Sequence, residues 1–323
     1  MHDLASIEAV IKRDRPLPAE RRCLRIILNP AAGQRQRRRL RATLEALGAL
    51  DCTFEVWETD GPGAATRLAL RAAEADCDLV VAAGGDGTVN EVINGLQTAN
   101  GPYPQPALAV LPLGTANVLA AELGLSLAPQ AIATTIASGD AEPISLGRAS
   151  CQMGGERHDR VFIMMAGAGF DAHVVENVNL AVKRAIGKGA YVLESLHQMA
   201  VFPFAPYDVM VDGRSYSAAS VVVANGRHYG GKYLVAPEAR LGDPGFQVCL
   251  FQRGGRVNAA RYASALLSGR LPTLPDIQLL SGREIRISGR LGEAVQGDGD
   301  VIGRLPVTIT TLPGTLRLVM PPA

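Results

Sequence analysis

The residues best suited to chemistry form a glycine-rich stretch that follows a short apolar run. Residues 79–83 are all apolar, which is typical of a strand buried on both faces. Residues 84–88 (Gly-Gly-Asp-Gly-Thr) come next, and glycines let a backbone turn sharply while a ligand approaches closely. Thr88 and Glu91 have the spacing of a helix capping box ahead of an apolar-periodic segment. The stretch therefore predicts a strand, a glycine loop and a helix start, where phosphate binds.

A purely structural explanation competes with this interpretation. Any tight turn between a strand and a helix favours glycine, and Thr88 could serve only as a cap. Asp86 weakens that explanation, because a turn does not need an acid inside its glycine loop.

Two further predicted strands end in small and polar residues. A strand at residues 24–28 is followed by Asn29 and Gly33, and a strand at residues 107–111 is followed by residues 112–117. Helical segments separate the strands, and this alternation implies a parallel sheet with right-handed crossovers. Ligands of such sheets bind outside the carboxyl ends of the strands. The convergence of three loops is a stronger signal than any one loop, although Asn29 and Gly33 are equally compatible with turn chemistry.

The composition limits the class of protein. A chain of 323 residues suggests about two domains, and an apolar fraction of 47% is enough for real cores. A formal net charge of +1 gives no overall attraction to nucleic acid or to an anionic membrane. Five scattered cysteines without a CxxC pair fit a cytosolic protein and argue against disulfides or a zinc site. Neither a secretory signal nor a membrane-spanning run is expected, so any membrane contact would be peripheral.

The pattern changes near residue 141, from where strands separated by frequent turns predict an all-β second domain. The predicted strands are residues 160–166, 207–211, 220–224, 246–251, 284–288, 307–311 and 315–319. A helical interruption at residues 172–199 is compatible with a core helix or with the wall of an apolar substrate cleft. Residues 1–21 are predicted to be a loose or helical lead-in.

Two segments concentrate basic residues, at 35–41 and at 183–188. A solvated helix face is the ordinary explanation, and contact with phosphate or anionic lipid is the functional one. Two motif matches are rejected. Residues 167–172 fit the dinucleotide fingerprint outside the βαβ series, and residues 226–232 fit P-loop spacing, but Tyr233 stands where Ser or Thr is required.

Taken together, the motifs resemble those of one family. The loop at residues 84–88 and the Gly-Thr-Ala-Asn loop at residues 114–117 are highly specific as a pair. They resemble the bacterial lipid kinases of the diacylglycerol kinase catalytic-domain family, which includes sphingosine and ceramide kinases and is more distantly related to NAD kinases. Further matching segments are residues 29–33, 167–171, 236–239 with Asp243, and 298–300, so the resemblance covers about residues 24–319.

The resemblance implies an α/β domain with a parallel sheet that binds ATP at residues 22–140. A β-sandwich domain that binds lipid would follow at residues 141–323, with the active site in the cleft between the domains. It remains open whether the C-terminal residues pack back on the first domain. The residues implied to contact ATP or lie near its phosphates are Asn29, Gly33, Thr59, Gly84, Gly85, Asp86, Gly87, Thr88, Val89, Asn90, Gly114, Thr115 and Asn117.

The resemblance also implies two magnesium ions. Asp243 would anchor a structural Mg²⁺ together with the backbone oxygens of Arg240 and Gly245. The family usually has Asp-Asp-Gly or Asn-Asp-Gly here, whereas this chain has Gly242-Asp243-Pro244-Gly245, so the site is altered or lost, or Asp243 only begins a turn. A catalytic Mg²⁺ would arrive with ATP, and Asp86 is expected to order it through water.

The catalytic base position departs from the family as well. Family members usually have Asp-Gly-Glu with Glu as the proton acceptor, and the matching residues here are Asp298-Gly299-Asp300. The reaction needs a carboxylate within hydrogen-bond reach of the substrate hydroxyl. Because aspartate is one methylene shorter, either the backbone lies closer or the role passes from Asp300 to Asp298 or Asp86. An ordinary β-turn explains the same residues.

The sequence therefore predicts an ATP-dependent lipid kinase of phospholipid metabolism, cytoplasmic and peripherally associated with membrane. Alternatives are a NAD kinase-like enzyme and a nucleotide-binding regulator that has lost catalysis. We expect a lipid substrate and no nucleic acid partner, and a homodimer is left open. The sequence does not distinguish diacylglycerol, phosphatidylglycerol, a sphingoid base or ceramide as the acceptor.

Overall fold

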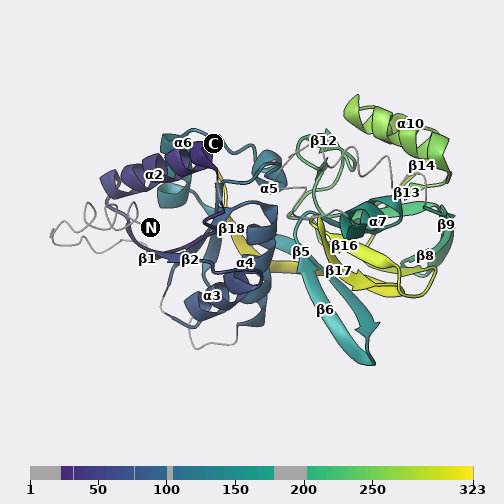
Figure 1. Ribbon diagram of the computed structural model, residues 1–323, viewed down its shortest axis with the longest axis horizontal. Coiled ribbons are helices and arrows are strands. Elements are labelled where there is room, and N and C mark those ends of the chain that lie inside the picture. The colour runs from purple at the N-terminus through teal and green to yellow at the C-terminus, as the bar shows by residue number, and fades with distance from the viewer. Residues whose placement is uncertain (1–22, 32, 76, 100–104, 178–201, 323) are drawn as a thin grey trace. The chain divides into compact units, whose positions relative to one another are not determined.

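The computed structural model describes residues 23–31, 33–75, 77–99, 105–177 and 202–322 (Figure 1). The chain divides into two compact units: the first comprises Met1–Pro143 and Leu316–Ala323, and the second comprises Ile144–Thr315. The predicted lead-in at residues 1–21 and the predicted helix beyond residue 177 lie outside the described residues. No helix within the described ranges is long and apolar enough to cross a membrane.

A parallel sheet forms the centre of the first unit, with the strand order β2-β1-β3-β4. Its strands are β1 (Cys23–Leu28), β2 (Thr53–Glu58), β3 (Leu79–Gly84) and β4 (Ala107–Pro112). Leu318, near the end of β18 (Val307–Val319), adds to this sheet by pairing in parallel with Leu108. Both β3 and β4 are buried along their whole length, which explains their continuously apolar sequences. The predicted parallel α/β fold is confirmed.

Helices cover both faces of this sheet (Figure 1). The described helices of the unit are α2 (Gln34–Ala49), α3 (Ala64–Ala73), α4 (Asp86–Thr98), α5 (Val118–Glu122) and α6 (Pro129–Ser138). Leu44 and Leu47 of α2 and Ile132 and Ile136 of α6 share one buried cluster with residues of β1, β3 and β4. The helices α3 and α4 pack on each other and contact β1 and β3, respectively.

A glycine sets the distance between α3 and α4. A Cβ atom on Gly95 of α4 would lie 2.3 Å from the carbonyl oxygen of Thr66 and 2.8 Å from the Cβ of Ala69. The facing part of α3 is built from buried small residues such as Ala65, Ala69 and Ala72. The helix that begins at the glycine loop is therefore held in place by a contact that leaves no room for a side chain.

The second unit is a β-sandwich, and the predicted sandwich is confirmed. One sheet is antiparallel, with the order β14-β13-β10-β7-β16-β17, and the strands β18, β15, β8 and β9 pair in this order in another sheet. The strands are β5 (Ala141–Met153), β6 (Glu156–Phe162), β7 (Met165–Ala168), β8 (Tyr207–Val211), β9 (Arg214–Ala218), β10 (Ser220–Ala224), β11 (His228–Tyr229), β12 (Tyr233–Leu234), β13 (Phe246–Phe251), β14 (Ile277–Gly282), β15 (Glu284–Ser288), β16 (Ala294–Gly297), β17 (Asp300–Arg304) and β18. The described helical segments are α7 (Phe170–Asn177), α10 (Arg256–Leu267) and the short 3₁₀ helix Leu271–Thr273.

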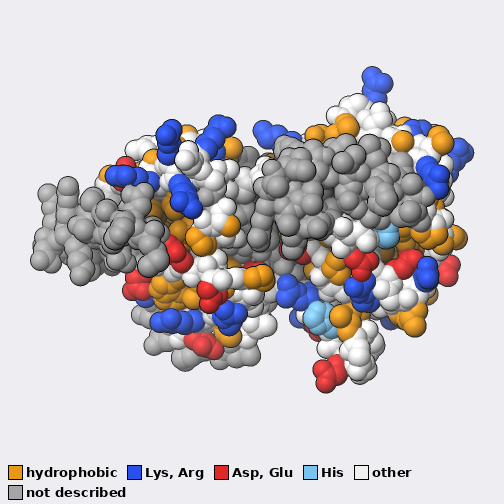
Figure 2. All heavy atoms as spheres, viewed as in Figure 1, with side chains coloured by type: hydrophobic (Ala, Val, Ile, Leu, Met, Phe, Trp, Pro, Cys, Tyr) orange, Lys and Arg blue, Asp and Glu red, His pale blue; other side chains and the backbone are white. Residues whose placement is uncertain are grey.

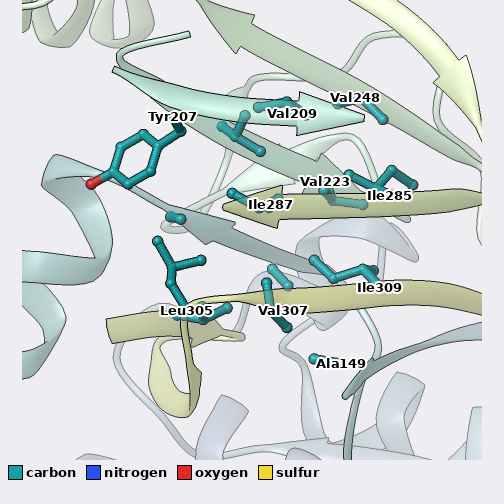
Figure 3. Close-up of a cluster of buried hydrophobic side chains, with 14 of the residues drawn as sticks. Ala149, Tyr207, Val209, Val223, Val248, Ile285, Ile287, Leu305, Val307 and Ile309 are labelled. Atoms are coloured by element: carbon teal, nitrogen blue, oxygen red, sulfur yellow. The ribbon is translucent and has the colours of Figure 1, made fainter. Parts of the chain in front are cut away.

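The core of the sandwich contains side chains from both sheets (Figure 3). Val209, Ile285 and Ile287 come from β8 and β15, and Val223 and Val248 come from β10 and β13. In β8 and β15 buried and exposed residues alternate, as expected for strands with one face on a core.

Several predicted strands differ from the structure in their extent. The strands predicted at residues 207–211, 220–224, 246–251 and 284–288 are found with the same bounds. The one predicted at residues 160–166 is divided between β6 and β7, because the N–H groups of Ile163 and Met164 donate to the carboxylate of Asp298. The two predicted at residues 307–311 and 315–319 form the single strand β18.

We predict that Gly95→Ala destabilises the first unit by about 1–3 kcal/mol, because the added methyl group overlaps the backbone of α3. The matched control is Gly48→Ala in α2, where a Cβ atom meets nothing within 4 Å. This control should be neutral or stabilising by up to about 1 kcal/mol, since alanine is the better helix former. Urea unfolding of both variants measures the difference, and equal stability of the two would contradict the packing argument.

Candidate active site

Two loops of the first unit meet through their glycines. A Cβ atom on Gly114 would lie 2.5 Å from the Cα of Gly85, and one on Gly85 would lie 3.1 Å from the Cα of Gly114. The N–H of Leu113 donates to the carbonyl of Gly84 at 2.8 Å, so the loops that follow β3 and β4 are joined backbone to backbone. Glycine is required here for close approach, as the sequence pattern indicated.

The predicted capping box at the start of α4 is wrong. The N-cap of α4 is Gly85, which has no side chain with which to cap the helix. Glu91 instead accepts the N–H groups of Gly63 and Ala65 at 2.9 and 3.0 Å and so caps α3. Thr88 Oγ1 accepts a 3.3 Å hydrogen bond from Asn29 Nδ2, which connects α4 to the loop after β1. The first turn of α4 therefore keeps the uncapped N–H groups and the dipole that favour an anion.

The side chain of Asp86 also connects the loop after β3 with the segment that follows β4. Its Oδ1 accepts the N–H of Val118, the first residue of α5, at 2.7 Å. Burial raises the pKa of this carboxyl group, and hydrogen bonds from the N–H groups of Val118, Leu119 and Asn117 oppose the shift. Asp86 therefore has a structural contact in addition to the metal-ordering role expected from the sequence.

The side chain of Asn117 is hydrogen-bonded to the backbone of Gly114 within the loop that follows β4. Its Oδ1 accepts the N–H of Gly114 at 2.8 Å, and its Nδ2 donates to the carbonyl of Gly114 at 2.9 Å. The backbone of Asn117 is left-handed, with φ of 49°, which asparagine tolerates better than most residues. Thr115 is left exposed at the tip of this loop.

The remaining nucleotide candidates of the first unit differ in exposure. Asn29 donates its backbone N–H to Ala83 at 3.0 Å, and Thr59 donates to Leu28 at 2.9 Å, so both lie at the carboxyl ends of the strands. Gly33, the N-cap of α2, and Gly87 are exposed. In contrast, Val89 and Asn90 are 3% and 2% exposed. Their side chains face the interior, and Asn90 Oδ1 accepts a hydrogen bond from Asn94.

The basic run of α2 lies mainly on the surface, and Figure 2 shows basic side chains over this helix. Arg35, Arg37 and Arg38 are exposed. Arg39 is partly buried and donates to the carbonyl of Pro112 at 2.8 Å, which ties α2 to the end of β4. Burial, with a smaller effect of Arg35, lowers the pKa of Arg39.

In the second unit, the predicted base lies on a tight hairpin. Gly297 pairs with Asp300, and the two residues between them, Asp298 and Gly299, have φ of 50° and 87°. Positive φ at both central residues is the type I′ geometry that favours Asp-Gly. Asp300 is exposed at the first position of β17. The β-turn explanation is therefore structurally correct, and it is compatible with the functional one.

The Asp298 carboxylate fixes this hairpin to the neighbouring segment. It accepts the N–H groups of Ile163, Met164 and Met165 at 2.8, 2.9 and 3.1 Å. Its own N–H donates to the carbonyl of Met165 at 3.0 Å. The Asp298 carboxylate therefore joins the hairpin to residues 163–165, and the side chain of Asp300 is exposed two positions further on.

Two of the predicted magnesium ligands, Asp243 and Gly245, line a hollow in the second unit. Asp243 lines a hollow of about 430 Å³ together with Asp212, Glu238 and the basic Arg283. The carboxylate of Asp212 already accepts the N–H groups of Arg283 and Glu284. At the predicted ligands, the carbonyl of Arg240 accepts the N–H of Asp243 at 3.0 Å, and Gly245 contributes only backbone. No cluster of three His, Cys, Asp or Glu side chains suited to a metal exists within the described residues, and the set of Asp243 with the backbone oxygens of Arg240 and Gly245 stays a prediction from the resemblance.

Sequence reasoning gave no role to Asp171, whose Oδ2 atom is buried. Asp171 lies in the first turn of α7, and the hydroxyl group of Tyr229 donates to its Oδ1. Burial raises the pKa of Asp171 to about 7, and a hydrogen bond with the Gln296 side chain opposes the shift. The sequence Gly-Phe-Asp at residues 169–171 was a usable signal for this residue, because it places an acid three positions after a buried strand.

Comparison with known proteins agrees with this architecture. The family model of the diacylglycerol kinase catalytic domain matches residues 23–149, and that of the YegS C-terminal NAD kinase beta sandwich-like domain matches residues 164–320. A diacylglycerol kinase of Bacillus subtilis (strain 168) is 28% identical over 303 residues, which cover 92% of this chain and 96% of that protein.

Two further relatives cover most of the chain. A Pseudomonas putida protein named "Probable lipid kinase YegS-like" is 31% identical over 242 residues, covering 72% of this chain and 76% of that protein. A crystal structure of a diacylglycerol kinase from Bacillus anthracis str. Sterne shares the fold, with a TM-score of 0.69 at 23% identity and coverage of 95% and 99% of the two chains.

The two matched domains follow one another in the same order as the α/β unit and the β-sandwich. The resemblance found from the motifs is thereby confirmed. The chain belongs to the lipid kinase family, phosphotransferases with an alcohol acceptor, whose members join a diacylglycerol kinase catalytic domain to a YegS-type β-sandwich domain.

Proposed function

We propose that this protein transfers the γ-phosphate of ATP to the hydroxyl group of a lipid. The observation that carries the proposal is the close approach of Gly85 and Gly114, which joins two loops at the carboxyl edge of a parallel sheet. Ligands of such sheets bind at this edge. Family membership supports phosphoryl transfer to an alcohol as the reaction.

The triphosphate would be held mainly by backbone groups. The start of α4 at Asp86 has no side-chain cap, so its N–H groups and helix dipole are suited to phosphate. Residues 84–88 contain no lysine, so charge would come from the dipole and from Mg²⁺ that accompanies ATP. When bound, that ion would neutralise charge on the transferred phosphoryl group. The exposed Gly87 and Thr115 are the loop residues best placed to contact the nucleotide.

Asp300 is the proposed proton acceptor. The substrate hydroxyl must lose its proton as its oxygen attacks phosphorus, and a carboxylate within hydrogen-bond reach can accept it. Asp298 is the weaker candidate, because its carboxylate oxygens are already engaged by three backbone N–H donors. Asp86 is engaged with α5. Asp300 is exposed and stands at the position where the family has its proton acceptor, so it is preferred among the three carboxylates.

The acceptor is proposed to be a diacylglycerol-like lipid, with a sphingoid base or ceramide as alternatives in the same class. Such lipids present a hydroxyl group beside apolar chains, and the enzyme must reach them at a membrane surface. The exposed Arg35, Arg37 and Arg38 of α2 would favour an anionic surface by roughly 1 kcal/mol per charge. We therefore propose a cytoplasmic, peripherally associated enzyme of phospholipid metabolism.

A lipid panel tests the function. Purified protein is given radiolabelled ATP, Mg²⁺ and micelles that contain diacylglycerol, phosphatidylglycerol, sphingosine or ceramide, with NAD as a separate acceptor. We expect labelled diacylglycerol, identified by product mass. Transfer to NAD alone would indicate a NAD kinase-like enzyme, and ATP binding without transfer to any acceptor would indicate a regulator.

In the same assay, Asp300→Asn should lower kcat by about 10²–10⁴-fold, because the general base is lost. The affinity for ATP should not change. Asp208→Asn, which alters an exposed aspartate of β8 in the same unit, serves as the matched control. Full activity of Asp300→Asn would remove this residue as the base.

We predict that Gly114→Ala weakens ATP binding by about 5- to 150-fold, because overpacking of this kind costs about 1–3 kcal/mol and separates the two loops. The added Cβ atom would lie 2.5 Å from Gly85 Cα. Calorimetric titration with ATP measures the change, and Gly48→Ala is again the control. Unchanged affinity would show that the meeting of the two loops is not part of the nucleotide site.

The two functions of Asp86 can be separated with Asp86→Asn. The amide oxygen can still accept the N–H of Val118, so α5 should remain capped and the protein should stay folded. The lost charge should lower kcat by about 10-fold or more if Asp86 stabilises the phosphoryl group through Mg²⁺. Thermal unfolding and steady-state kinetics are measured together; retained kcat would limit Asp86 to its structural contact.

A further inference from the structure

Helix α10 lies at the surface of the second unit and has polar contacts on its inner side (Figure 1). The hydroxyl group of Tyr262 donates to Oδ2 of Asp276 at 2.6 Å, and Arg261 forms an ion pair with the same carboxylate. The ring of Tyr262 packs edge-on against Phe251 of β13, with the ring centroids 5.1 Å apart. Asp276 is 5% exposed and directly precedes β14. The inner side of α10 is therefore attached to the sheet around a buried carboxylate.

The outer side of α10 is mainly apolar. A surface helix normally turns its charged residues to solvent and its apolar residues to the core. Here, Val257 is 82% exposed and Leu267 is 64% exposed. The exposed residues recur at spacings of three, four and seven, which place them on one side of the helix. They are Arg256, Val257, Ala260, Ala263, Ser264 and Leu267. Apolar residues gathered on an exposed face mark a surface that binds a partner.

The charge around this face indicates the chemistry of the partner. Residues 251–275 contain four arginines and neither aspartate nor glutamate. Arg261 is paired with Asp276, whereas Arg256 at the start of α10 and Arg270 just beyond its end are exposed. An apolar strip flanked by exposed arginines is complementary to an anionic bilayer, because arginines can reach lipid phosphates while apolar side chains enter the acyl boundary. A nucleic acid would match the arginines but not the apolar strip.

We propose that the outer face of α10 docks the protein onto an anionic lipid membrane. Val257 and Leu267 enter the acyl boundary, and Arg256 and Arg270 contact lipid phosphates. The choice of a membrane as the partner rests on the proposed function, whose substrate is a lipid. It adds an apolar anchor to the electrostatic contact proposed for α2. A second copy of the chain is the competing occupant of the face.

Two pairs of substitutions separate the apolar part of the contact from the electrostatic part. The apolar pair is Val257→Gln with Leu267→Gln, and the arginine pair is Arg256→Gln with Arg270→Gln. All four side chains are exposed, so both variants should unfold in urea at the wild-type midpoint.

The matched control is Arg290→Gln with Leu291→Gln. It removes an exposed arginine and an exposed leucine from the segment between β15 and β16. Binding is measured without ATP, by sedimentation with vesicles of phosphatidylcholine alone or mixed with phosphatidylglycerol.

On the mixed vesicles, the apolar pair should lower the partition coefficient at least about 10-fold, because two side chains no longer leave water. The arginine pair should lower it by about 10- to 30-fold. High salt screens exposed charges, so it should remove the difference between the wild type and the arginine pair. The control should partition like the wild type.

Insertion is measured directly with Ala260→Trp, which places an indole on the same face. Lipids brominated on their acyl chains quench a tryptophan that reaches them. The native Trp57, the only tryptophan of the chain, gives the background in the wild-type protein. We expect quenching of the variant to exceed this background on mixed vesicles. The same measurement decides the proposal if a paired variant fails to fold.

Wild-type partitioning of either pair would overturn the proposal, as would quenching no greater than the background. A protein that ignores vesicles but sediments as a dimer, which the apolar pair dissociates, would assign the face to a second copy instead. Vesicle binding without phosphorylation of any lipid in the panel would refute the proposed function alone. Phosphorylation of lipid in micelles without vesicle binding would refute the docking face alone.

Discussion

The first unit depends on a close contact between two backbone segments. The contact is so close that neither segment has room for a side chain there. Gly85 and Gly114 lie directly against each other, and the hydrogen bond from Leu113 to Gly84 continues the pairing of β3 and β4 into the loops. The two strands are buried throughout, so their carboxyl ends have little freedom to separate. Rigid strands and touching glycines together define a preorganised backbone surface beside the start of α4, which is the kind of site that phosphate transfer requires.

Carboxylates that bind distant backbone N–H groups complete the scaffold. Asp86 caps α5, Glu91 caps α3, and in the second unit Asp298 and Asp212 hold the segments at residues 163–165 and 283–284. Each satisfies N–H groups that the nearby helix or sheet leaves unpaired. Such charge-assisted bonds are stronger than neutral ones, so a few acids fix the loops of each unit that carry the candidate residues.

What could be predicted from the sequence was mainly local. Continuous apolar strands, the glycine loop and the Asp-Gly turn follow from short-range patterns, and the parallel sheet follows from their order. The contact made by Glu91 could not be predicted, because its partner Gly63 lies 28 positions away in the sequence. A local capping box is compatible with the same residues. The partners of Asp298 lie more than 130 positions away, and only the fold brings them together. The metal ligands near Asp243 stay a prediction from the resemblance.

The strand β18 has a consequence for how the chain reaches its native state. Leu318 completes the sheet of the first unit by pairing with Leu108, although the whole second unit lies between them in the sequence. During translation, the outer edge of β4 is therefore an open β-edge until the ribosome has released residues 316–319. Unpaired edges of this kind promote aggregation, so this edge of β4 stays open to mispairing while the second unit is being synthesised.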